Sequence, residues 1–367
     1  MKEIKVNLTY NPYIVYIGGQ FTKSALHLTA QKGQKALIIT DENVNKLYTA
    51  KLESAIDEAG YFAVTKVIPA GEKYKNMDTV KIMYEECLAH NMDRGSIIIA
   101  LGGGVVGDMA GFTASIYLRG IPFIQIPTTL LAQVDAGIGG KTGIDLPQGK
   151  NLIGTFYQPK FVWIDPNVLT TLDDKEYING LAEVIKYGII KDEKLFDYLK
   201  ENVKDVLEKN TNALEYILSA CVKIKADVVA KDEKEQGLRR ILNFGHTLGH
   251  ALEAQEGYTA RHGECVAVGM SFAAFVSHKT GICDGEILDK IDEILVDYGF
   301  KDVIIKYKEL LGSGGKKADD VIKIMKNDKK MDQGKVNYVL PVKIGGVVVK
   351  ELILDDLEKI LHDWGKL

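Results

Sequence analysis

Six short apolar runs in the first part of the chain place the strongest constraint on its fold. Two of them read KALIIT and SIIIAL, and both are rich in β-branched residues without alternating polar positions. Runs of this kind are typical of strands that are buried on both faces of a sheet. The six strand candidates are Tyr13–Ile17, Lys35–Thr40, Ala63–Pro69, Ser96–Leu101, Phe123–Pro127 and Phe161–Asp165.

Helical patterns separate several of these runs. Asn43–Ala59 follows the second strand candidate, and Met77–His90 follows the third. Alternation of strands with helices favours a mostly parallel, Rossmann-like sheet that carries helices on both faces. We therefore predict an α/β domain over residues 1–172 and expect it to bind a nucleotide.

Helical periodicity dominates from about Asp173 onward. A hairpin that turns at Gly345 and Gly346 and a final helix at Leu354–Trp364 close the chain. A chain of 367 residues is long for one domain, so a second, mainly α-helical domain is predicted over 173–367. The helical segments lie near 175–190, 192–208, 211–230, 239–255, 262–280, 284–298, 302–311 and 317–327.

Composition argues against some partners. Lys and Arg number 46 against 50 Asp and Glu, and this net charge of −4 gives no reason to expect nucleic acid or an anionic membrane. No run approaches the roughly 18 consecutive apolar residues that a membrane-spanning helix needs. The four cysteines show no paired spacing, which favours reduced thiols and a cytoplasmic location.

A glycine-rich loop follows the strand candidate Ser96–Leu101. Gly102, Gly104 and Gly107 match the pattern GxGxxG, and a helical pattern follows them. Glycines here permit a tight turn and let backbone amides approach a pyrophosphate at a helix N-terminus. The loop comes late in the sheet and lacks an acidic residue about 20 positions on, so it differs from the usual Rossmann fingerprint. The alternative is a turn that needs glycine only for close helix packing.

Two upstream loops are candidates to complete a nucleotide site. Asp41 and Asn43 follow the strand candidate Lys35–Thr40, where a carboxylate and an amide can hold ribose hydroxyls or adenine. Gly71–Lys75 follows the strand candidate Ala63–Pro69. Both loops are equally well interpreted as helix caps and solvated turns.

A long glycine-rich run, IPTTLLAQVDAGIGGKTGIDLPQGKNLIGTFYQP, begins within the strand candidate Phe123–Pro127. Long irregular segments in compact domains are usually functional or disordered, and the apolar residues threaded through this one argue against disorder. We therefore interpret it as an irregular functional segment. Lys141 and Lys150 within it, together with Arg119, are candidates to bind phosphate or carboxylate groups.

Three histidines lie in the stretch RRILNFGHTLGHALEAQEGYTARHGE. His246 and His250 are four residues apart in a helical pattern, so both rings leave one face, and Arg239 and Asn243 extend this polar stripe. Neutral imidazoles are good ligands for a divalent transition metal, and a carboxylate as third ligand leaves a position open for a substrate oxygen. The alternative is a histidine pair without a metal, because the HExxH protease motif is absent.

The segment GLAEVIKYG supplies a candidate carboxylate. Glu183 and Lys186 share a helix face at i and i+3. They are interpreted either as a surface ion pair or as a metal ligand beside a substrate-binding cation. Their apolar neighbours favour the second interpretation.

Together these stretches resemble the 3-dehydroquinate synthase family of sugar phosphate cyclases. The resemblance implies a dehydroquinate synthase-like fold and a homodimeric lyase that uses NAD and a divalent metal, Zn²⁺ or Co²⁺. The implied reaction converts DAHP, a seven-carbon sugar acid phosphate, to 3-dehydroquinate and inorganic phosphate in the shikimate pathway. The matching segments are GGGVVGDMAGFTASIYLRG, IPTTLLAQVDAGIGGKTGID, GKNLIGTFYQP, GLAEVIKYGII, RRILNFGHTLGHALE, HGECVAVGM and DKK at 328–330.

The resemblance also implies roles for individual residues. The implied metal ligands are Glu183, His246 and His262. The implied NAD contacts are Gly71, Glu72, Lys75, Gly104, Val105, Val106, Gly107, Asp108, Thr128, Thr129, Lys141, Lys150, Leu169, Thr170 and Thr171, and the loop after Lys35–Thr40 adds Asp41 and Asn43 as candidates. The implied catalytic and substrate-binding residues are Arg119, Asp135, Lys141, Lys150, Asn151, Lys186, Lys225, Arg239, Asn243, His250 and Lys329, with Lys330 as an alternative to Lys329.

Two other activities fit parts of the sequence. A metal-dependent polyol dehydrogenase shares the fold and the nucleotide loop, but it has no need of a cluster of phosphate-directed cations. Another sugar phosphate cyclase would act on a different, neutral sugar phosphate. Lys225, Arg239 and Asn243 favour a substrate that carries a carboxylate. A non-catalytic NAD-binding module would not need the implied ligands and cations.

Overall fold

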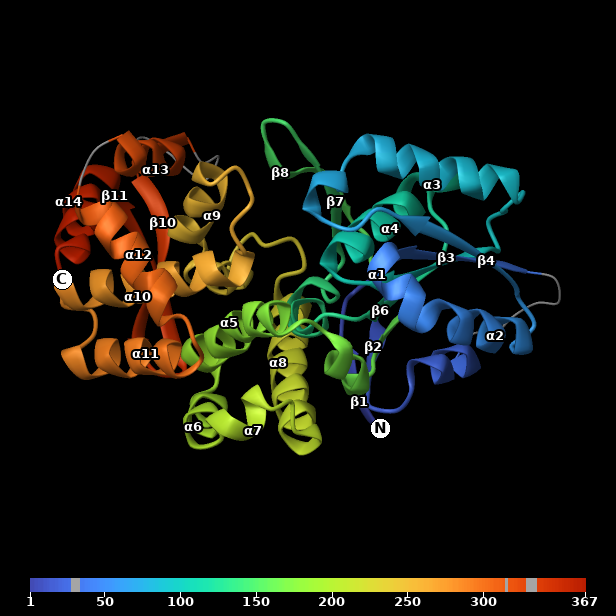
Figure 1. The fold of residues 1–367 in the computed structure, drawn as a ribbon, viewed down its shortest axis with the longest axis horizontal. Helices are drawn as coiled ribbons and strands as arrows, with labels where there is room; N and C mark the ends of the chain where they lie inside the picture. The colour runs from blue at the N-terminus through green and yellow to red at the C-terminus, as the bar shows by residue number, and fades with distance from the viewer. Residues whose placement is uncertain (28–33, 314–315, 328–334) are drawn as a thin grey trace. The chain divides into compact units, whose positions relative to one another are not determined.

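The computed structural model describes residues 1–27, 34–313, 316–327 and 335–367, and the chain divides into two compact units (Figure 1). Unit 1 comprises Met1–Tyr177 and Leu214–Lys234, and unit 2 comprises Ile178–Ala213 and Glu235–Leu367. Residues 214–234 thus group with the first unit, although they lie inside the range predicted for the second domain. The assignment of NAD binding to 1–172 and of metal and substrate binding to 173–367 stays a prediction.

A seven-stranded sheet with the order β1-β2-β9-β6-β5-β3-β4 forms the centre of unit 1. Within this sheet β1 pairs with β2 antiparallel, and every other recorded pair of neighbours is parallel. The six predicted strands and their mostly parallel arrangement are confirmed. The strands are β1 (Lys2–Val6), β2 (Tyr13–Ile17), β3 (Lys35–Asp41), β4 (Phe62–Ile68), β5 (Ile97–Gly102), β6 (Phe123–Pro127) and β9 (Phe161–Ile164).

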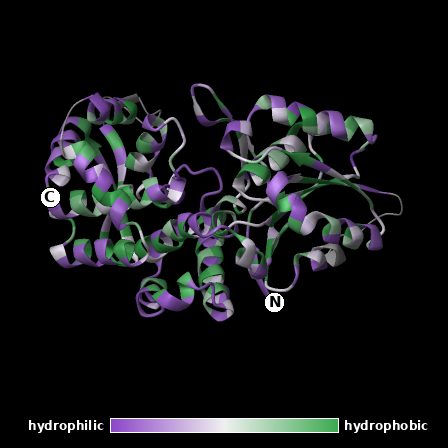
Figure 2. Cartoon of the chain, viewed as in Figure 1, coloured by the Kyte–Doolittle hydropathy of each residue, from purple (hydrophilic) through white to green (hydrophobic). Residues whose placement is uncertain are grey.

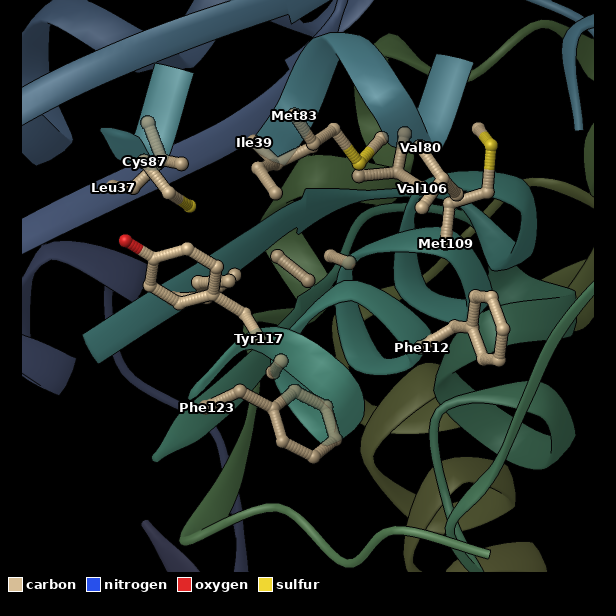
Figure 3. Packing of buried hydrophobic residues seen from close by; sticks show 14 of the residues in the cluster. Leu37, Ile39, Val80, Met83, Cys87, Val106, Met109, Phe112, Tyr117 and Phe123 are labelled. Carbon is tan, nitrogen blue, oxygen red and sulfur yellow. The ribbon is translucent and has the colours of Figure 1, made fainter. Parts of the chain in front are cut away.

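Helices cover both faces of this sheet. Leu37 and Ile39 of β3 join a hydrophobic cluster with side chains of α3 and α4 (Figure 3). Ala36 and Ile38 of the same strand join a second cluster that includes side chains of α2. Successive side chains of a strand point to opposite faces, so the two clusters lie on opposite faces of the sheet. The helices are α2 (Ala50–Glu58), α3 (Met77–Ala89) and α4 (Gly104–Ile116).

The glycine-rich run after β6 is not an irregular segment, so that prediction is wrong. It forms one helical turn and an antiparallel hairpin. Gly143 and Gly154 pair across this hairpin, and a Cβ on Gly143 would lie 2.6 Å from the carbonyl oxygen of Ile153. These glycines permit two strands to approach closely. In the sequence, the same glycines are interpreted as a sign of irregular structure. The elements are η5 (Ala132–Ala136), β7 (Lys141–Leu146) and β8 (Gly149–Phe156).

Short helical turns and one long helix complete unit 1. The helix predicted over 43–59 is divided, because a wider π-helical turn lies between two α-helical pieces. The remaining elements are η1 (Phe21–His27), α1 (Glu42–Val44), η2 (Asn45–Thr49), η3 (Glu72–Tyr74), η4 (Tyr117–Arg119), η6 (Pro166–Thr171) and α8 (Thr211–Lys231).

Unit 2 is mainly helical, and helix α10 is its most buried element. Every residue of α10 from Cys265 to Ser277 is buried, and α9, α11, α12, α14 and β10 pack against it. Hydrophilic and hydrophobic residues alternate along outer helices such as α11 (Figure 2). The elements are α5 (Asp174–Lys191), α6 (Glu193–Glu201), α7 (Val203–Leu207), η7 (Leu238–Asn243), α9 (His246–Gln255), α10 (His262–Lys279), α11 (Gly285–Asp297), α12 (Lys301–Gly312), α13 (Lys316–Asn327), β10 (Lys335–Lys343), β11 (Gly346–Ile353) and α14 (Leu354–Gly365).

The predicted hairpin and final helix are confirmed. β10 and β11 pair antiparallel, and Gly345 adopts a positive φ of 78° at their turn. Among the helices of the described ranges, none combines the length and hydrophobicity that crossing a lipid bilayer requires.

Candidate active site

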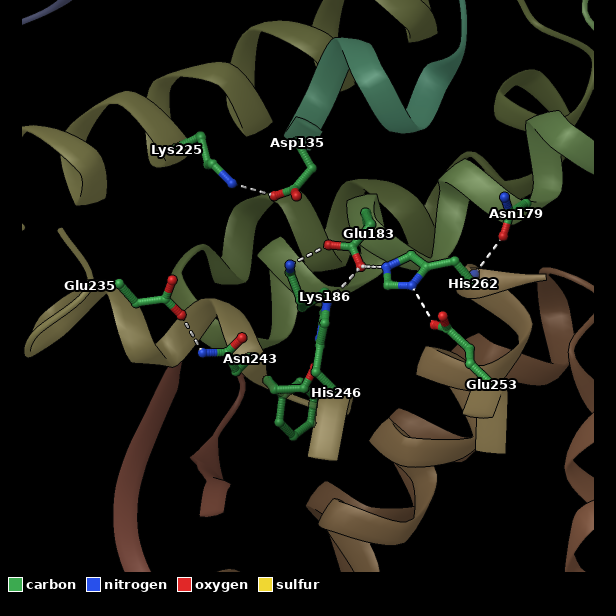
Figure 4. A network of polar contacts seen from close by, with 12 residues as sticks. Asp135, Asn179, Glu183, Lys186, Lys225, Glu235, Asn243, His246, Glu253 and His262 are labelled. Atoms are coloured by element: carbon green, nitrogen blue, oxygen red, sulfur yellow. Dashed lines mark hydrogen bonds and ion pairs between the residues drawn. The ribbon is translucent and has the colours of Figure 1, made fainter. Parts of the chain in front are cut away.

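Three side chains of unit 2 come together as the sequence predicts. Glu183 lies in α5, His246 is the first residue of α9, and His262 is the first residue of α10. The Nε2 atoms of His246 and His262 each lie 3.5 Å from Oε1 of Glu183 (Figure 4). The Glu183 carboxylate is fully buried, and one ligand atom from each residue lies within 4.8 Å of the others.

The other ring nitrogen of each imidazole, Nδ1, is hydrogen-bonded within the protein. Nδ1 of His246 lies 2.9 Å from the carbonyl oxygen of Phe244, and Nδ1 of His262 lies 2.6 Å from Oε1 of Glu253. Both partners are acceptors, so both Nδ1 atoms donate a hydrogen, and in the neutral rings both Nε2 lone pairs face Glu183. Two lone pairs and a carboxylate oxygen repel one another unless a proton or a metal cation lies among them. The donor set therefore fits a divalent transition metal.

The two rings differ in their affinity for a proton. Burial lowers the pKa of His246, and the nearby Lys186 cation adds to this effect. Burial also acts to lower the pKa of His262, but hydrogen bonds to Glu183 and Glu253 outweigh it and raise the pKa to about 9. A metal that binds Nε2 of His262 must displace this proton, so binding is coupled to proton release.

The single helix predicted over 239–255 is wrong. The chain forms the 3-10 helix η7, passes through Gly245 in a left-handed conformation, and begins α9 at His246. A Cβ on Gly245 would lie 2.6 Å from Cγ of Met270 and 2.7 Å from the carbonyl oxygen of Val266. Glycine is therefore required at the point where the two helices meet.

The predicted polar stripe is consequently split between two elements. Arg239 and Asn243 lie on η7, where Arg239 is buried and Nδ2 of Asn243 donates to Oε1 of Glu235 at 2.6 Å. His246 and His250 share a face of α9, and their ring centroids lie 5.2 Å apart. The ring of His250, an exposed residue, lies 6.1 Å from that of His262, measured between centroids.

Lys186 is buried rather than part of a surface ion pair. Its side chain is 1% exposed, and its Nζ contacts Oε2 of Glu183. Its ammonium group also lies 5.1 Å from the ring centroid of Tyr187. The interpretation of this pair as a surface ion pair is therefore wrong, and the roles of Glu183 as a metal ligand and of Lys186 toward a substrate stay predictions.

In unit 1 the glycine loop forms the N-terminus of α4. A Cβ on Gly104 would have its nearest neighbour, Cβ of Ala136, at 3.4 Å, so close packing does not by itself require glycine at this position. A Cβ on Gly102 would lie 2.6 Å from Cγ2 of Val106, and one on Gly107 would lie 2.6 Å from Oε1 of Gln125. The amide of Gly107 donates to the carbonyl oxygen of Gly103. The packing interpretation therefore holds for Gly102 and Gly107, and the helix N-terminus at Gly104 suits a phosphate.

The position of this loop in the sheet supports a nucleotide site. Strands β3 and β5 are parallel neighbours, but β3 leads to α2 on one face and β5 leads to α4 on the other. In open α/β sheets, ligands bind outside the carboxyl ends of strands at such a switch point. Asp41 ends β3 and Gly102 ends β5, so the two predicted loops flank the same point.

Lys75 connects two groups of predicted residues in unit 1. Its Nζ lies 2.7 Å from Oδ2 of Asp108 and 2.6 Å from Oδ1 of Asn151. Burial acts to lower the pKa of Lys75, but Asp108 and Glu72 outweigh it and raise the pKa. The amide of Asn151 donates to Oδ1 of Asp145 at 2.7 Å. Asp108, a predicted NAD contact, and Asn151, a predicted substrate residue, therefore both contact the buried Lys75.

Other predicted residues have defined partners in unit 1. Asp41 caps α1 by accepting from the amides of Asn43 and Val44, as the alternative interpretation of this loop expected. Nζ of Lys225, in α8, lies 2.6 Å from Oδ1 of Asp135. Nζ of Lys150 lies 3.6 Å from Oε1 of Glu72.

The remaining predicted site residues differ in their contacts, backbone conformation and burial. Oγ1 of Thr129 accepts from the amide of Ala132, and the hydroxyl of Thr171 contacts that of Tyr48. Gly71 and Arg119 adopt positive φ values of 110° and 68°. Lys329 and Lys330 lie outside the described residues. Val106, Thr128 and Leu169 are buried, Val105 is half-buried, and Arg119, Lys141 and Thr170 are exposed.

Two residues beside the cluster of Glu183, His246 and His262 are missed by the sequence interpretation. Glu253 binds Nδ1 of His262, and Oδ1 of Asn179 accepts from the amide of Gly263 at 2.5 Å. Spacing contains a usable signal, because Glu253 lies seven residues after His246 and Asn179 lies four before Glu183. Both intervals place the side chain on the ligand's own helix face.

Comparison with known proteins identifies the family. Models of the 3-dehydroquinate synthase N-terminal and C-terminal regions match residues 65–179 and 180–331. The chain belongs to the 3-dehydroquinate synthase family. A 3-dehydroquinate synthase from Caldanaerobacter subterraneus is 44% identical over 98% of this chain and 100% of its own length. One from Rippkaea orientalis is 43% identical over 99% of each chain.

Solved structures of sugar phosphate cyclases have the same fold. A 2-epi-5-epi-valiolone synthase from Streptomyces hygroscopicus, with NAD⁺ and Zn²⁺ bound, is 27% identical with a TM-score of 0.82. That match covers 100% of this chain and 98% of the other. A 2-deoxy-scyllo-inosose synthase, complexed with carbaglucose-6-phosphate, NAD⁺ and Co²⁺, is 23% identical with a TM-score of 0.88 over 99% and 100% of the two chains. The dehydroquinate synthase-like fold is therefore confirmed.

Proposed function

We propose that this chain is a lyase that converts DAHP to 3-dehydroquinate and inorganic phosphate, a step of the shikimate pathway to aromatic amino acids. The observation that carries the proposal is the convergence of two imidazole Nε2 atoms on one buried carboxylate oxygen, Oε1 of Glu183. Identity of 44% to a curated 3-dehydroquinate synthase over nearly the whole chain supports this choice of substrate.

The proposed cofactors are NAD and one divalent ion, Zn²⁺ or Co²⁺. When bound, NAD would supply reversible hydride transfer and the metal would stabilise negative charge on substrate oxygens, so the reaction has no net redox change. The first residues of α4 and the side chain of Asp41 would hold the dinucleotide at the switch point of the sheet. Glu183, His246 and His262 would hold the metal.

In unit 2, Arg239 and Asn243 are assigned to the substrate carboxylate. Arg239 is 1% exposed, so its guanidinium group is held in a water-poor environment that strengthens charge-assisted hydrogen bonds. We assign His250 the transfer of protons to or from the substrate through its imidazole nitrogens. Its ring is exposed and lies beside the metal-ligand group, as a general acid or base requires.

In unit 1, Arg119, Lys141 and Lys150 are assigned to the substrate phosphate. In the proposed β-elimination, a proton leaves C6 and the phosphate departs with the bonding electrons. The departing phosphate is itself a base of suitable strength, so these cations orient the group and stabilise its charge. Lys225 and Asp135, which pair at 2.6 Å, are assigned to the substrate with Asn151.

The competing candidate function is that of another sugar phosphate cyclase, which would act on a substrate other than DAHP. The 2-epi-5-epi-valiolone synthase whose structure resembles this chain favours it, at 27% identity. We prefer DAHP because the identity to curated 3-dehydroquinate synthases is higher. We also propose that the protein is cytoplasmic, consistent with its four free, buried cysteines, and that it forms a homodimer. Light scattering after gel filtration tests the dimer.

The deciding experiment is an assay of the purified protein with Zn²⁺ or Co²⁺, DAHP and NAD at far below the substrate concentration. Phosphate and 3-dehydroquinate should appear in equal amounts, with no lasting rise in NADH absorbance. Accumulation of NADH with a polyol would instead indicate a dehydrogenase. Phosphate release from a neutral sugar phosphate, without turnover of DAHP, would indicate another cyclase.

A further inference from the structure

Glu253 lies behind one ligand of the proposed metal centre. Its Oε1 is 2.6 Å from Nδ1 of His262, and its side chain is only 2% exposed (Figure 4). Glu253 and His246 are seven residues apart, close to two turns of α9, and therefore share a face. One helix thus supplies both a proposed ligand, His246, and the carboxylate that contacts the ligand on α10.

The contact is on the side of the His262 ring away from the proposed metal. Nε2 faces Glu183, whereas Nδ1 faces Glu253. His250, Glu253 and His262 are also close enough to form a three-residue ligand group. A metal in that group that used Nδ1 would have to break the 2.6 Å hydrogen bond. The geometry therefore favours an action of Glu253 through His262 rather than as a ligand.

The backbone of His262 is held independently of Glu253. The amide of Gly263 donates to Oδ1 of Asn179, a residue of α5 that lies one turn before Glu183. A Cβ at Gly263 would collide with the carbonyl oxygen of Asn179, so α5 and the start of α10 are in close contact. With the main chain fixed in this way, what remains to be set is the orientation and tautomer of the imidazole.

We propose that Glu253 is a positioning residue that fixes the His262 ring with its Nε2 lone pair directed at the metal and strengthens that nitrogen as a donor. The inference rests on the proposed function, because it requires a metal at Glu183, His246 and His262. A carboxylate behind a histidine ligand restricts the ring to one tautomer and raises its basicity, and its loss typically weakens metal binding roughly 10–100-fold.

The test is a Co²⁺ titration of metal-free wild type and of Glu253→Gln, followed by the visible absorption bands of the bound ion. Glutamine keeps the size of the side chain and an oxygen acceptor but removes the charge. We expect Co²⁺ to bind the variant at least about tenfold more weakly and with shifted bands. The matched control is Glu264→Gln, which also removes one negative charge and lies two residues after His262. Glu264 pairs with Arg261 at 3.5 Å. The control should bind Co²⁺ as the wild type does.

Several outcomes separate the claims. Equal affinity and identical bands in wild type and Glu253→Gln would overturn the positioning role, and so would an equal loss in the Glu264→Gln control. A wild type that binds no Co²⁺ would instead overturn the metal centre of the proposed function. Thermal unfolding of the metal-free proteins reports folding. If Glu253→Gln does not fold, Glu253→Asp replaces it, since the shorter side chain draws the charge away from Nδ1 and should also weaken binding.

Discussion

Nδ1 of His246 lies 2.9 Å from the carbonyl oxygen of Phe244, and the residue between them, Gly245, has a φ of +77°. The left-handed glycine turns the chain so that the first residue of α9 can bond to the residue two positions before it. This turn sets the tautomer of one proposed metal ligand. The local backbone is therefore part of the site.

Gly245→Ala should destabilise the protein by about 2–4 kcal/mol, because a left-handed alanine is strained and its Cβ overlaps Met270 and Val266. Urea unfolding measures this free energy. The control is Gly257→Ala, where φ is +61° but a Cβ would have nothing within 4 Å. It should cost about 1 kcal/mol. Equal losses in the two variants would show that the close packing at Gly245 has no energetic effect.

His250→Ala should separate proton transfer from metal binding. We expect kcat to fall roughly 100-fold or more, as for loss of a general acid or base, with Co²⁺ affinity unchanged. His246→Ala should lose Co²⁺ affinity together with turnover. Steady-state kinetics and Co²⁺ titration of both variants provide the comparison. A His250→Ala protein that no longer binds Co²⁺ would move the metal to the group of His250, Glu253 and His262.

Lys75→Met should weaken NAD binding, because Lys75 joins Asp108, in the first turns of α4, to Asn151. Removing this buried cation should also destabilise the fold by about 1–3 kcal/mol, since Asp108 loses its partner while only 18% exposed. Calorimetric NAD titration and urea unfolding measure the two effects. Lys81→Met, which removes a 73% exposed lysine from α3, should leave both quantities within about 1 kcal/mol of wild type. Unchanged NAD affinity in Lys75→Met would contradict the role of Lys75 in NAD binding.

Lys225→Met should lower kcat/KM for DAHP at least roughly 100-fold, the effect of losing about 2.7 kcal/mol of transition-state stabilisation. The variant removes the 2.6 Å pair with Asp135. Lys223→Met changes an exposed lysine on the same helix and should have wild-type kinetics. If the two variants retain equal activity, Lys225 has no role toward the substrate.

The strands of unit 1 could be predicted because burial on both faces leaves a direct signature. Residues 36–39 of β3 and 97–101 of β5 are all apolar, and each side of the sheet receives alternate residues. β1 gives no such signal, because KEIKV is a mostly exposed strand at the edge of the sheet. β7 and β8 escaped prediction because their glycines serve close strand contact, whereas glycine in sequence suggests loops.

The site was predictable in its ligand types but not in its supporting contacts. Periodicity places His246 and His250 on one face, but it cannot detect that Gly245 interrupts the helix, since the requirement comes from Met270 and Val266 on α10. For a residue that acts on another side chain, such as Glu253, the sequence gives only its interval of seven residues from His246, which shows a shared helix face but no partner. Only the packing of α9 against α10 reveals the contact with His262.

The most direct test of this account is the activity of the metal-free protein as Co²⁺ or Zn²⁺ is added back. We predict that protein treated with a chelator releases no phosphate from DAHP in the presence of NAD. Activity should return in proportion to added metal and saturate at one ion per chain, and Glu183→Gln should not recover at the same metal concentration. Full turnover by the metal-free protein, or wild-type recovery by Glu183→Gln, would contradict the role assigned to Glu183, His246 and His262.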